Sequence, residues 1–128
     1  MSDLQDFRQQ AHTRARGRSA ETSAVDWLER NGYSIRERNH STPAGEIDVV
    51  ATEGDTLCFI EIKARAGATF GPAIAAVTPR KQRRLARAAA LYLVSQPFSG
   101  PCRFDVLGLD SGPDGWEFTL VRNAFEVP

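Results

Sequence analysis

The chain has 128 residues, of which 41% are hydrophobic, enough for one compact domain with a modest core and too few to expect a second domain. Its formal net charge is zero, so a generally basic protein is excluded and any surface for nucleic acid must come from local clustering of charge. No apolar run approaches membrane-spanning length, and the two cysteines are too few for a disulfide framework, so we expect a cytoplasmic protein without membrane contact.

The first 18 residues are polar and rich in arginine, with no sustained apolar period. We expect residues 1–18 to form a flexible basic arm and residues 19–128 to form a single domain. The arm is either a solvated tail or a segment that contacts phosphate when substrate is present.

A helix is predicted from about Ser19 to Asn31, where apolar residues recur at helical spacing before an Asn31-Gly32 stop signal. Glu21 shares or borders the apolar stripe of this helix. A carboxylate in that position is costly unless it is paired, hydrogen-bonded or bound to a metal. Alternatively, Glu21 is a first-turn acid that the helix dipole stabilises.

A strand is predicted over Tyr33–Arg38, followed by a loop from Asn39 to Ala44. His40 falls in this loop. It has no metal-binding companion nearby in the sequence, so we expect a surface histidine.

Residues 45–65 read as two strands joined by a tight turn at Gly54-Asp55. If Glu53 faces Thr56, counting outward places Ile47 opposite Ile62 and Asp48 opposite Glu61. Like charges so close on one face repel each other, so a cation is expected between them.

On the second of these strands, the period of two places Glu61 and Lys63 on the same face, where they converge with Asp48. Two carboxylates and a neighbouring backbone carbonyl, that of Ile62, suit a hard cation such as Mg²⁺. A lysine beside this metal would orient or deprotonate an attacking water. The alternative is a plain cross-strand ion pair between Asp48 and Lys63, or edge charges that oppose aggregation.

A glycine-containing loop is predicted over 66–77, and a second helix begins at Thr78, with Pro79 at the first helical position. Four arginines of this helix recur at spacings of three and four and form either a phosphate-binding face or a solvated basic face. These residues are Arg80, Arg83, Arg84 and Arg87.

Two more strands are predicted over Cys102–Leu109 and Trp116–Arg122. Between them lies the turn sequence DSGPDG. The element order of helix, three strands, helix and two strands predicts an α/β sandwich with a mixed central sheet flanked by helices.

Asp48 and Glu61-x-Lys63 resemble the PD-(D/E)XK signature of the restriction-endonuclease-like fold, with Ile47 in place of the proline. The strings GRSAETSAVDWLERNGYSI, GEIDVVA, FIEIKAR, AVTPRKQRRLARAAALYL and RFDVLGL resemble the YraN-like family of small bacterial predicted endonucleases. This likeness covers roughly residues 17–109. The family is similar in architecture to archaeal Holliday-junction resolvases.

The resemblance implies a metal-dependent endonuclease that hydrolyses phosphodiester bonds in DNA, with a preference for branched or otherwise structured DNA. Asp48 and Glu61 would bind Mg²⁺, for which Mn²⁺ would substitute, with the Ile62 carbonyl as a further ligand. Lys63 would activate water, and Glu21 would approach the metal from the first helix. A symmetric homodimer would suit a two-stranded substrate, by analogy.

Two other functions remain open. The first is a non-catalytic nucleic-acid-binding module that retains the nuclease fold. The second is a metal-dependent phosphoesterase for a small nucleotide, in which neutralising the helical arginines would have little effect.

Overall fold

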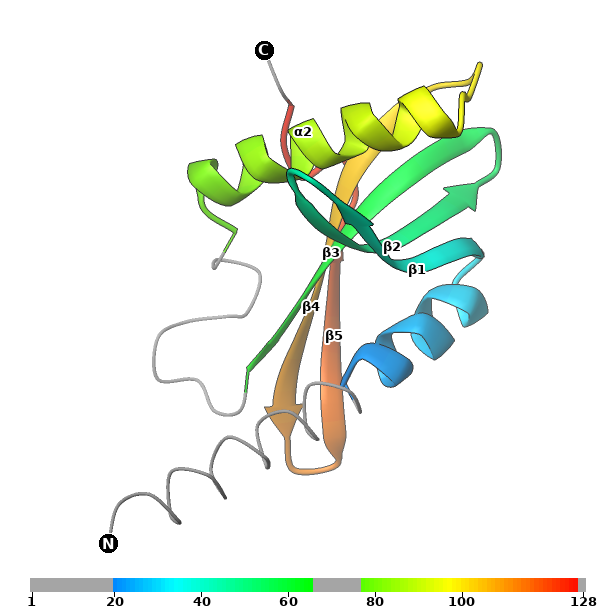
Figure 1. The fold of residues 1–128 in the computed structure, drawn as a ribbon. Helices are drawn as coiled ribbons and strands as arrows, with labels where there is room; N and C mark the ends of the chain where they lie inside the picture. Colours follow the sequence, from blue (N-terminus) through cyan, green and yellow to red (C-terminus); the bar gives the residue numbers. More distant parts are fainter. Residues whose placement is uncertain (1–19, 66–76, 127–128) are drawn as a thin grey trace, which may run out of the picture.

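The computed structural model describes residues 20–65 and 77–126, and its centre is a five-stranded sheet in the order β1-β2-β3-β4-β5 (Figure 1). β3 and β4 run parallel, and the other neighbouring strands run antiparallel. The strands are β1 (Ser34–Thr42), β2 (Gly45–Glu53), β3 (Thr56–Arg65), β4 (Cys102–Gly112) and β5 (Gly115–Val121).

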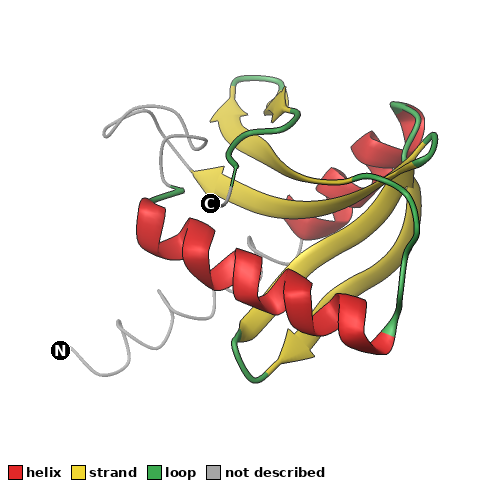
Figure 2. Cartoon of the chain, turned by 90° about the horizontal axis from the view of Figure 1, so that it is seen from above, coloured by secondary structure: helices red, strands yellow, loops and turns green. Residues whose placement is uncertain are grey.

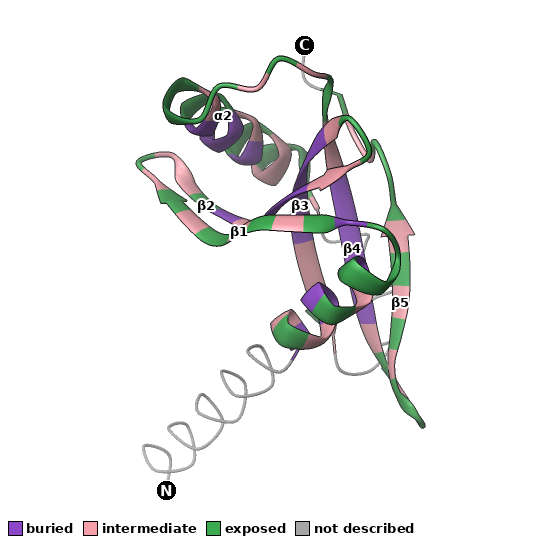
Figure 3. Cartoon of the chain, turned by 90° about the vertical axis from the view of Figure 1, so that its right-hand side faces the viewer, coloured by how far each residue is buried: buried purple, intermediate pink, exposed green. Residues whose placement is uncertain are grey.

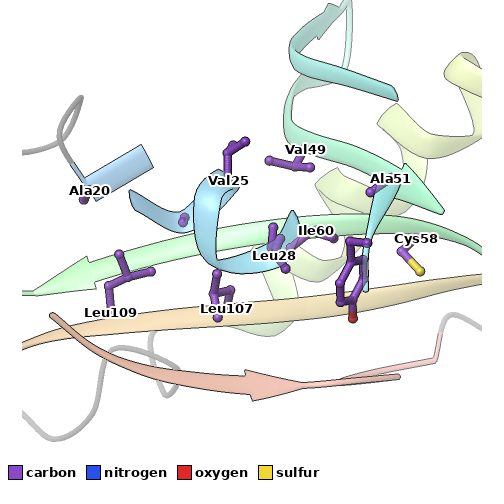
Figure 4. Packing of buried hydrophobic residues seen from close by; sticks show 11 residues of the cluster. Ala20, Val25, Leu28, Val49, Ala51, Cys58, Ile60, Leu107 and Leu109 are labelled. Atoms are coloured by element: carbon purple, nitrogen blue, oxygen red, sulfur yellow. The ribbon is translucent and has the colours of Figure 1, made fainter. Parts of the chain in front are cut away.

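One helix covers each face of this sheet, as the view from above shows (Figure 2). The N-terminal helix (residues 20–30) packs Ala24 and Leu28 against Val49 and Ile60, in the cluster drawn in Figure 4. α2 (Pro79–Ser95) turns its buried stripe toward the opposite face, where Tyr92 packs against Phe59 (Figure 3). The expected α/β sandwich with a mixed central sheet is therefore confirmed.

Both helices are delimited by the signals that predicted them. The N-terminal helix ends at Asn31 and Gly32, and Gly32 takes a φ of +96°, a conformation that side chains with a Cβ rarely adopt. At the start of α2, Thr78 Oγ1 accepts a hydrogen bond from the Lys81 backbone N–H, and Pro79 follows the cap.

β1 is longer than predicted, because the segment over 39–42 is strand and only residues 43–44 turn. Pairing with β2 continues to Thr42 opposite Gly45, so the antiparallel ladder overrides the polar sequence. Asn39 accommodates a φ of +53° within the strand. His40, predicted on a surface loop, is therefore half-buried and packs edge-on against Tyr92.

The predicted arm (residues 1–18) and nearly all of the predicted loop (residues 66–77) lie outside the described residues. Within the part of the chain that is described, no helix is long and apolar enough to cross a membrane.

Asp105 is a fully buried acid that ties together three segments of the chain. Its carboxylate accepts hydrogen bonds from the Tyr33 hydroxyl at 2.9 Å, from Arg103 Nε at 2.9 Å and from the Asn123 backbone N–H at 2.9 Å. Arg103 also pairs with Glu53. Burial, followed by the hydrogen bond to Asp105, raises the pKa of Tyr33 above its ordinary value. The acid thus has a structural role, and its partners are fully satisfied.

We expect Asp105→Ala to lower the free energy of unfolding by about 3 to 5 kcal/mol, because it leaves the buried Tyr33 hydroxyl without its acceptor and the half-buried Arg103 charge with Glu53 as its remaining partner. Urea unfolding followed by circular dichroism measures the change. Asp114→Asn, in the exposed turn before β5, is the matched control and should leave the midpoint unchanged. Equal midpoints for wild type and Asp105→Ala would contradict the structural role.

Candidate functional site

The sheet divides into a fork where β2 and β3 stop pairing with each other. The predicted register is confirmed from Glu53 opposite Thr56 to Val49 opposite Ile60, where the described ladder ends. Beyond this point β2 continues its pairing with β1, and β3 continues with β4. Figure 1 shows the β1–β2 hairpin turning toward α2 while β3 and β4 run on together. The next residue is Asp48 on β2 and Glu61 on β3.

The two carboxylates lie side by side at this fork. The Ile62 backbone N–H donates a 2.8 Å hydrogen bond to Asp48 Oδ2, so a side chain takes the place of the next main-chain partner on β2. Burial, followed by the charge of Glu61, raises the pKa of Asp48 to about 7, although the Ile62 N–H and Lys63 oppose this rise. The predicted convergence of Asp48 and Glu61 is therefore seen in the structure, and Ile62 lies beside both.

Lys63 completes the group expected from the sequence. Its Nζ lies 3.2 Å from Glu61 Oε1, and both side chains are largely removed from solvent, with exposed fractions of 22% and 8%. The period of two on β3 places Phe59, Glu61 and Lys63 on the face that α2 covers, as expected. The ion pair between Asp48 and Lys63, considered as the alternative to a metal site, is not the one formed: Lys63 pairs with Glu61 and acts on Asp48 through its charge.

Sequence reasoning missed the position of Lys81, which comes from the first turn of α2. A hydrogen bond with Lys63, which a neutral Lys81 amine would accept, and then the charge of Lys63 lower the pKa of Lys81. Glu61 opposes this effect, so Lys81 is close enough to sense the carboxylates. The sequence shows Lys81 only as one cation in a basic run, and its approach to Lys63 depends on how α2 docks on the sheet.

A groove of about 400 Å³ runs along α2 from this lysine. Its lining consists of Thr78, Arg80, Lys81, Arg84 and Arg87. The first turn of α2 contains no acidic residue, so the positive end of the helix dipole adds to these charges. Arg83 lies on a neighbouring hollow with Ala86 and Ala90. Three of the four predicted arginines therefore line the groove, and Arg83 lies to one side of it.

Gly45 brings the β1–β2 hairpin close to this basic face. It has a φ of +134°, and a Cβ added there would lie 3.1 Å from Arg84 Cδ. Glycine is favoured here because other residues rarely adopt this φ and because a Cβ would crowd the Arg84 side chain. Arg84 therefore lies directly over the end of the hairpin. The first residue of the GEIDVVA string thus helps to place the groove beside the fork.

Glu21 is held by β1 and not by the carboxylate pair in this structure. The Asn39 side-chain amide donates a hydrogen bond to Glu21 Oε1, and Arg38 Nη2 lies 3.8 Å from the same oxygen. Arg38 pairs with Val49 and His40 pairs with Ile47, so Asn39 occupies the register position opposite Asp48. Asn39 therefore lies between Glu21 and the fork. Its hydrogen bond to Glu21 accounts for a carboxylate beside the apolar stripe.

The donor set at the fork fits a hard divalent cation. Two adjacent carboxylates in a partly dry site repel each other, as the raised pKa of Asp48 reports, and a divalent cation would relieve that repulsion. Within residues 20–65 and 77–126, no group of three or more His, Cys, Asp or Glu side chains could hold a metal ion. Asp48 and Glu61 are the two carboxylates that the fork brings together.

The chain matches the model of a family described as "Uncharacterised protein family UPF0102" over residues 20–109. A UPF0102 protein of Symbiobacterium thermophilum is 45% identical over 115 residues, covering 87% of this chain and 96% of the relative. Relatives from Chromohalobacter salexigens and Pseudomonas putida are 41% and 42% identical, covering 90% and 89% of this chain and 94% of each relative. The chain therefore belongs to the UPF0102 family, the YraN-like family that its motifs resemble.

Proposed function

We propose that this protein is a cytoplasmic, metal-dependent endonuclease with a restriction-endonuclease-like fold that hydrolyses phosphodiester bonds in DNA. The observation that carries the proposal is the fork itself. Asp48 and Glu61 lie adjacent where two strands separate, and Lys63 is 3.2 Å from Glu61. An ordinary hairpin gains nothing from this arrangement, because the repulsion of the carboxylates opposes folding.

Each residue has a role that follows from its position. Asp48 and Glu61, with the Ile62 carbonyl, would hold Mg²⁺ or Mn²⁺, and Ile62 N–H fixes the direction of the Asp48 carboxylate. The bound metal would polarise the scissile phosphate and stabilise the departing oxygen. Lys63 would orient or deprotonate a water for in-line attack. Glu21 would act through Asn39 or through a water at the edge of the site.

The arginine-lined groove would bind the DNA backbone. Arg80, Arg84 and Arg87 offer charge without any arrangement that would read base edges, so we propose a preference for DNA structure over sequence. Arg83 would contribute less because it lies on the adjoining hollow. Two copies of the chain would suit a branched, two-stranded substrate.

We expect purified wild-type protein to cut flapped or four-way DNA in Mg²⁺ or Mn²⁺ and not in EDTA. Asp48→Asn and Lys63→Ala should each reduce the cleavage rate by about 10² to 10⁴, because one removes a metal ligand and the other removes the group that handles the proton. Lys63→Arg should also fail, since guanidinium stays protonated. Gel assays with end-labelled linear, flapped and four-way DNA measure these rates.

Asp55→Asn is the control for this series, because Asp55 is an exposed acid at the other end of the same hairpin. It should cut like wild type. If wild type binds DNA and never cuts it in either metal, the protein is a binding module. Hydrolysis of small nucleotides with no effect of the arginines would instead support a phosphoesterase.

The fork also predicts how stability depends on pH. Since the folded-state pKa of Asp48 is about 7, above its ordinary value of 3.8, folding favours the protonated form. Its contribution is fully present below pH 3.8 and is lost as the pH rises through 7. Asp48→Asn should therefore stabilise the metal-free protein, by an amount that grows by about 2 kcal/mol between pH 5 and pH 8.

Urea unfolding in EDTA at both pH values measures this difference. Asp55→Asn should show no such growth. Parallel stability–pH curves for wild type and Asp48→Asn would mean that burial and the charge of Glu61 do not raise the pKa of Asp48 as described.

A further inference from the structure

An apolar hollow adjoins the arginine-lined groove at the C-terminal half of α2. Its volume is about 630 Å³, and its lining consists of Pro43, Ala44, Arg87, Ala90 and Leu91. Figure 3 shows the β1–β2 hairpin ending beside α2, and the hollow lies between the turn of that hairpin and the helix. We call it the hairpin hollow. Its volume is in the range of ligand sites in proteins.

The groove and the hairpin hollow share one side chain. Arg87 lines both the groove, which continues toward the first turn of α2, and the hollow, which continues toward Leu91. The hairpin turn joins them as well, because Ala44 lines the hollow and the next residue, Gly45, lies against Arg84 of the groove. A strand whose backbone follows the groove therefore reaches the hollow without leaving the protein surface.

The surface of α2 combines exposed apolar groups with cations that lack an acidic partner. Leu91 and Val94, which are 41% and 80% exposed, are two of the three large hydrophobic residues exposed in the described part of the chain. α2 contains no acidic residue, and none of the ion pairs formed within residues 20–65 and 77–126 involves an arginine of this helix. Such a surface favours a ligand that carries anionic groups beside apolar ones.

Polar groups of the hairpin turn are paired within the turn. Thr42 Oγ1 accepts a hydrogen bond from the Ala44 N–H at 3.1 Å and donates one to the Gly45 carbonyl at 2.7 Å. Apart from Arg87, the side chains that line the hollow are aliphatic. They therefore suit the carbon face of a planar ring, and they cannot read its hydrogen-bonding edge.

A membrane surface fits this helix less well than a nucleic-acid strand does. A helix that lies on anionic lipid presents an apolar face along its length. The outer stripe of α2 instead changes from arginine over residues 83–87 to apolar side chains over residues 90–94. A nucleic-acid strand carries a phosphate and a base in every unit, so it can contact both halves of the stripe. The apolar stripe that does follow α2 is buried against the sheet and consists of Leu85, Ala88, Ala89 and Tyr92.

We propose that the hairpin hollow receives one unpaired nucleobase of the DNA strand whose backbone lies in the arginine-lined groove. The inference rests on the proposed function in taking the ligand to be DNA, and it adds a site for a base beside the groove for phosphate. A base within a duplex must unstack and unpair before it can enter such a hollow. An overhang, flap or junction supplies a base without that cost, which gives the proposed preference for structured DNA a physical cause.

A DNA duplex of 12 base pairs with a six-nucleotide single-stranded overhang tests the site in EDTA, where no cleavage is expected. 2-Aminopurine replaces one overhang base at a time, and a matched DNA with an abasic residue at the same position removes the base and keeps its phosphate. We expect 2-aminopurine fluorescence to rise on protein binding at one or two adjacent positions, because an aliphatic hollow separates the base from its stacked neighbours. The abasic residue at that position should weaken binding about three- to tenfold.

Two variants alter the hollow from the exposed side of α2. Leu91→Ser removes one of its apolar walls and should bind base-containing and abasic overhangs equally, with the affinity for abasic DNA unchanged. Ala90→Leu fills the hollow and should have the same effect. Val94→Ser is the matched control, because Val94 is an exposed apolar residue of the same helix outside the lining, and it should keep the wild-type preference. Amide spectra of each variant verify folding.

Equal affinity of the wild type for base-containing and abasic overhangs would overturn the proposal. So would a fluorescence rise that is the same at every position and survives Leu91→Ser. Binding to phosphatidylserine vesicles that is lost in Leu91→Ser, without base-dependent binding of DNA, would assign the hollow to a lipid and also overturn it.

Cleavage of flapped DNA is measured separately in Mg²⁺, so the two proposals fail in different ways. Base-dependent affinity without any cleavage would support the hollow and remove the nuclease. Cleavage together with equal affinity for the two overhangs would support the nuclease and remove the hollow.

Discussion

Two carboxylates are held together at the point where the sheet divides, and their mutual repulsion is the constraint on which the rest of the site depends. Asp48 and Glu61 are the first residues of β2 and β3 beyond their shared ladder, and because Glu61 is buried and Asp48 half-buried, water screens their charges only in part. The neighbouring groups reduce the cost: Ile62 N–H donates to Asp48, and Lys63 pairs with Glu61. A divalent cation, as proposed for this site, would relieve the remaining repulsion.

The rest of the fold holds the strands of this site in place despite the repulsion. Each face of β3 is covered by a helix, so the strand that carries Glu61 and Lys63 has a packed core on both sides. The buried network of Asp105 with Tyr33 and Arg103 joins the opposite part of the sheet to the C-terminal segment. The Asp105 network and the carboxylate pair therefore lie in different parts of the sheet.

The sequence predicts the local features well and the junctions between elements poorly. The cap at Thr78 and the hairpin register from Glu53 to Val49 follow from short-range rules, and both are confirmed. The fork is not visible in the sequence, because the alternation that predicts the ladder continues beyond the residue where pairing stops. The effect of Lys63 on the pKa of Lys81 depends on how α2 docks, and that docking is a property of the core. The contact of Glu21 with Asn39 likewise depends on β1 extending past its predicted end.

Paramagnetic broadening by Mn²⁺ tests most directly whether the fork binds a divalent cation, as proposed. Substoichiometric Mn²⁺ added to ¹⁵N-labelled protein should first broaden the amide signals of Asp48, Glu61 and Ile62, and excess Mg²⁺ should restore them. In Asp48→Asn the same additions should leave these signals sharp. Broadening that instead follows the exposed acids of the surface, or that is equal in wild type and Asp48→Asn, would contradict a metal site at the fork.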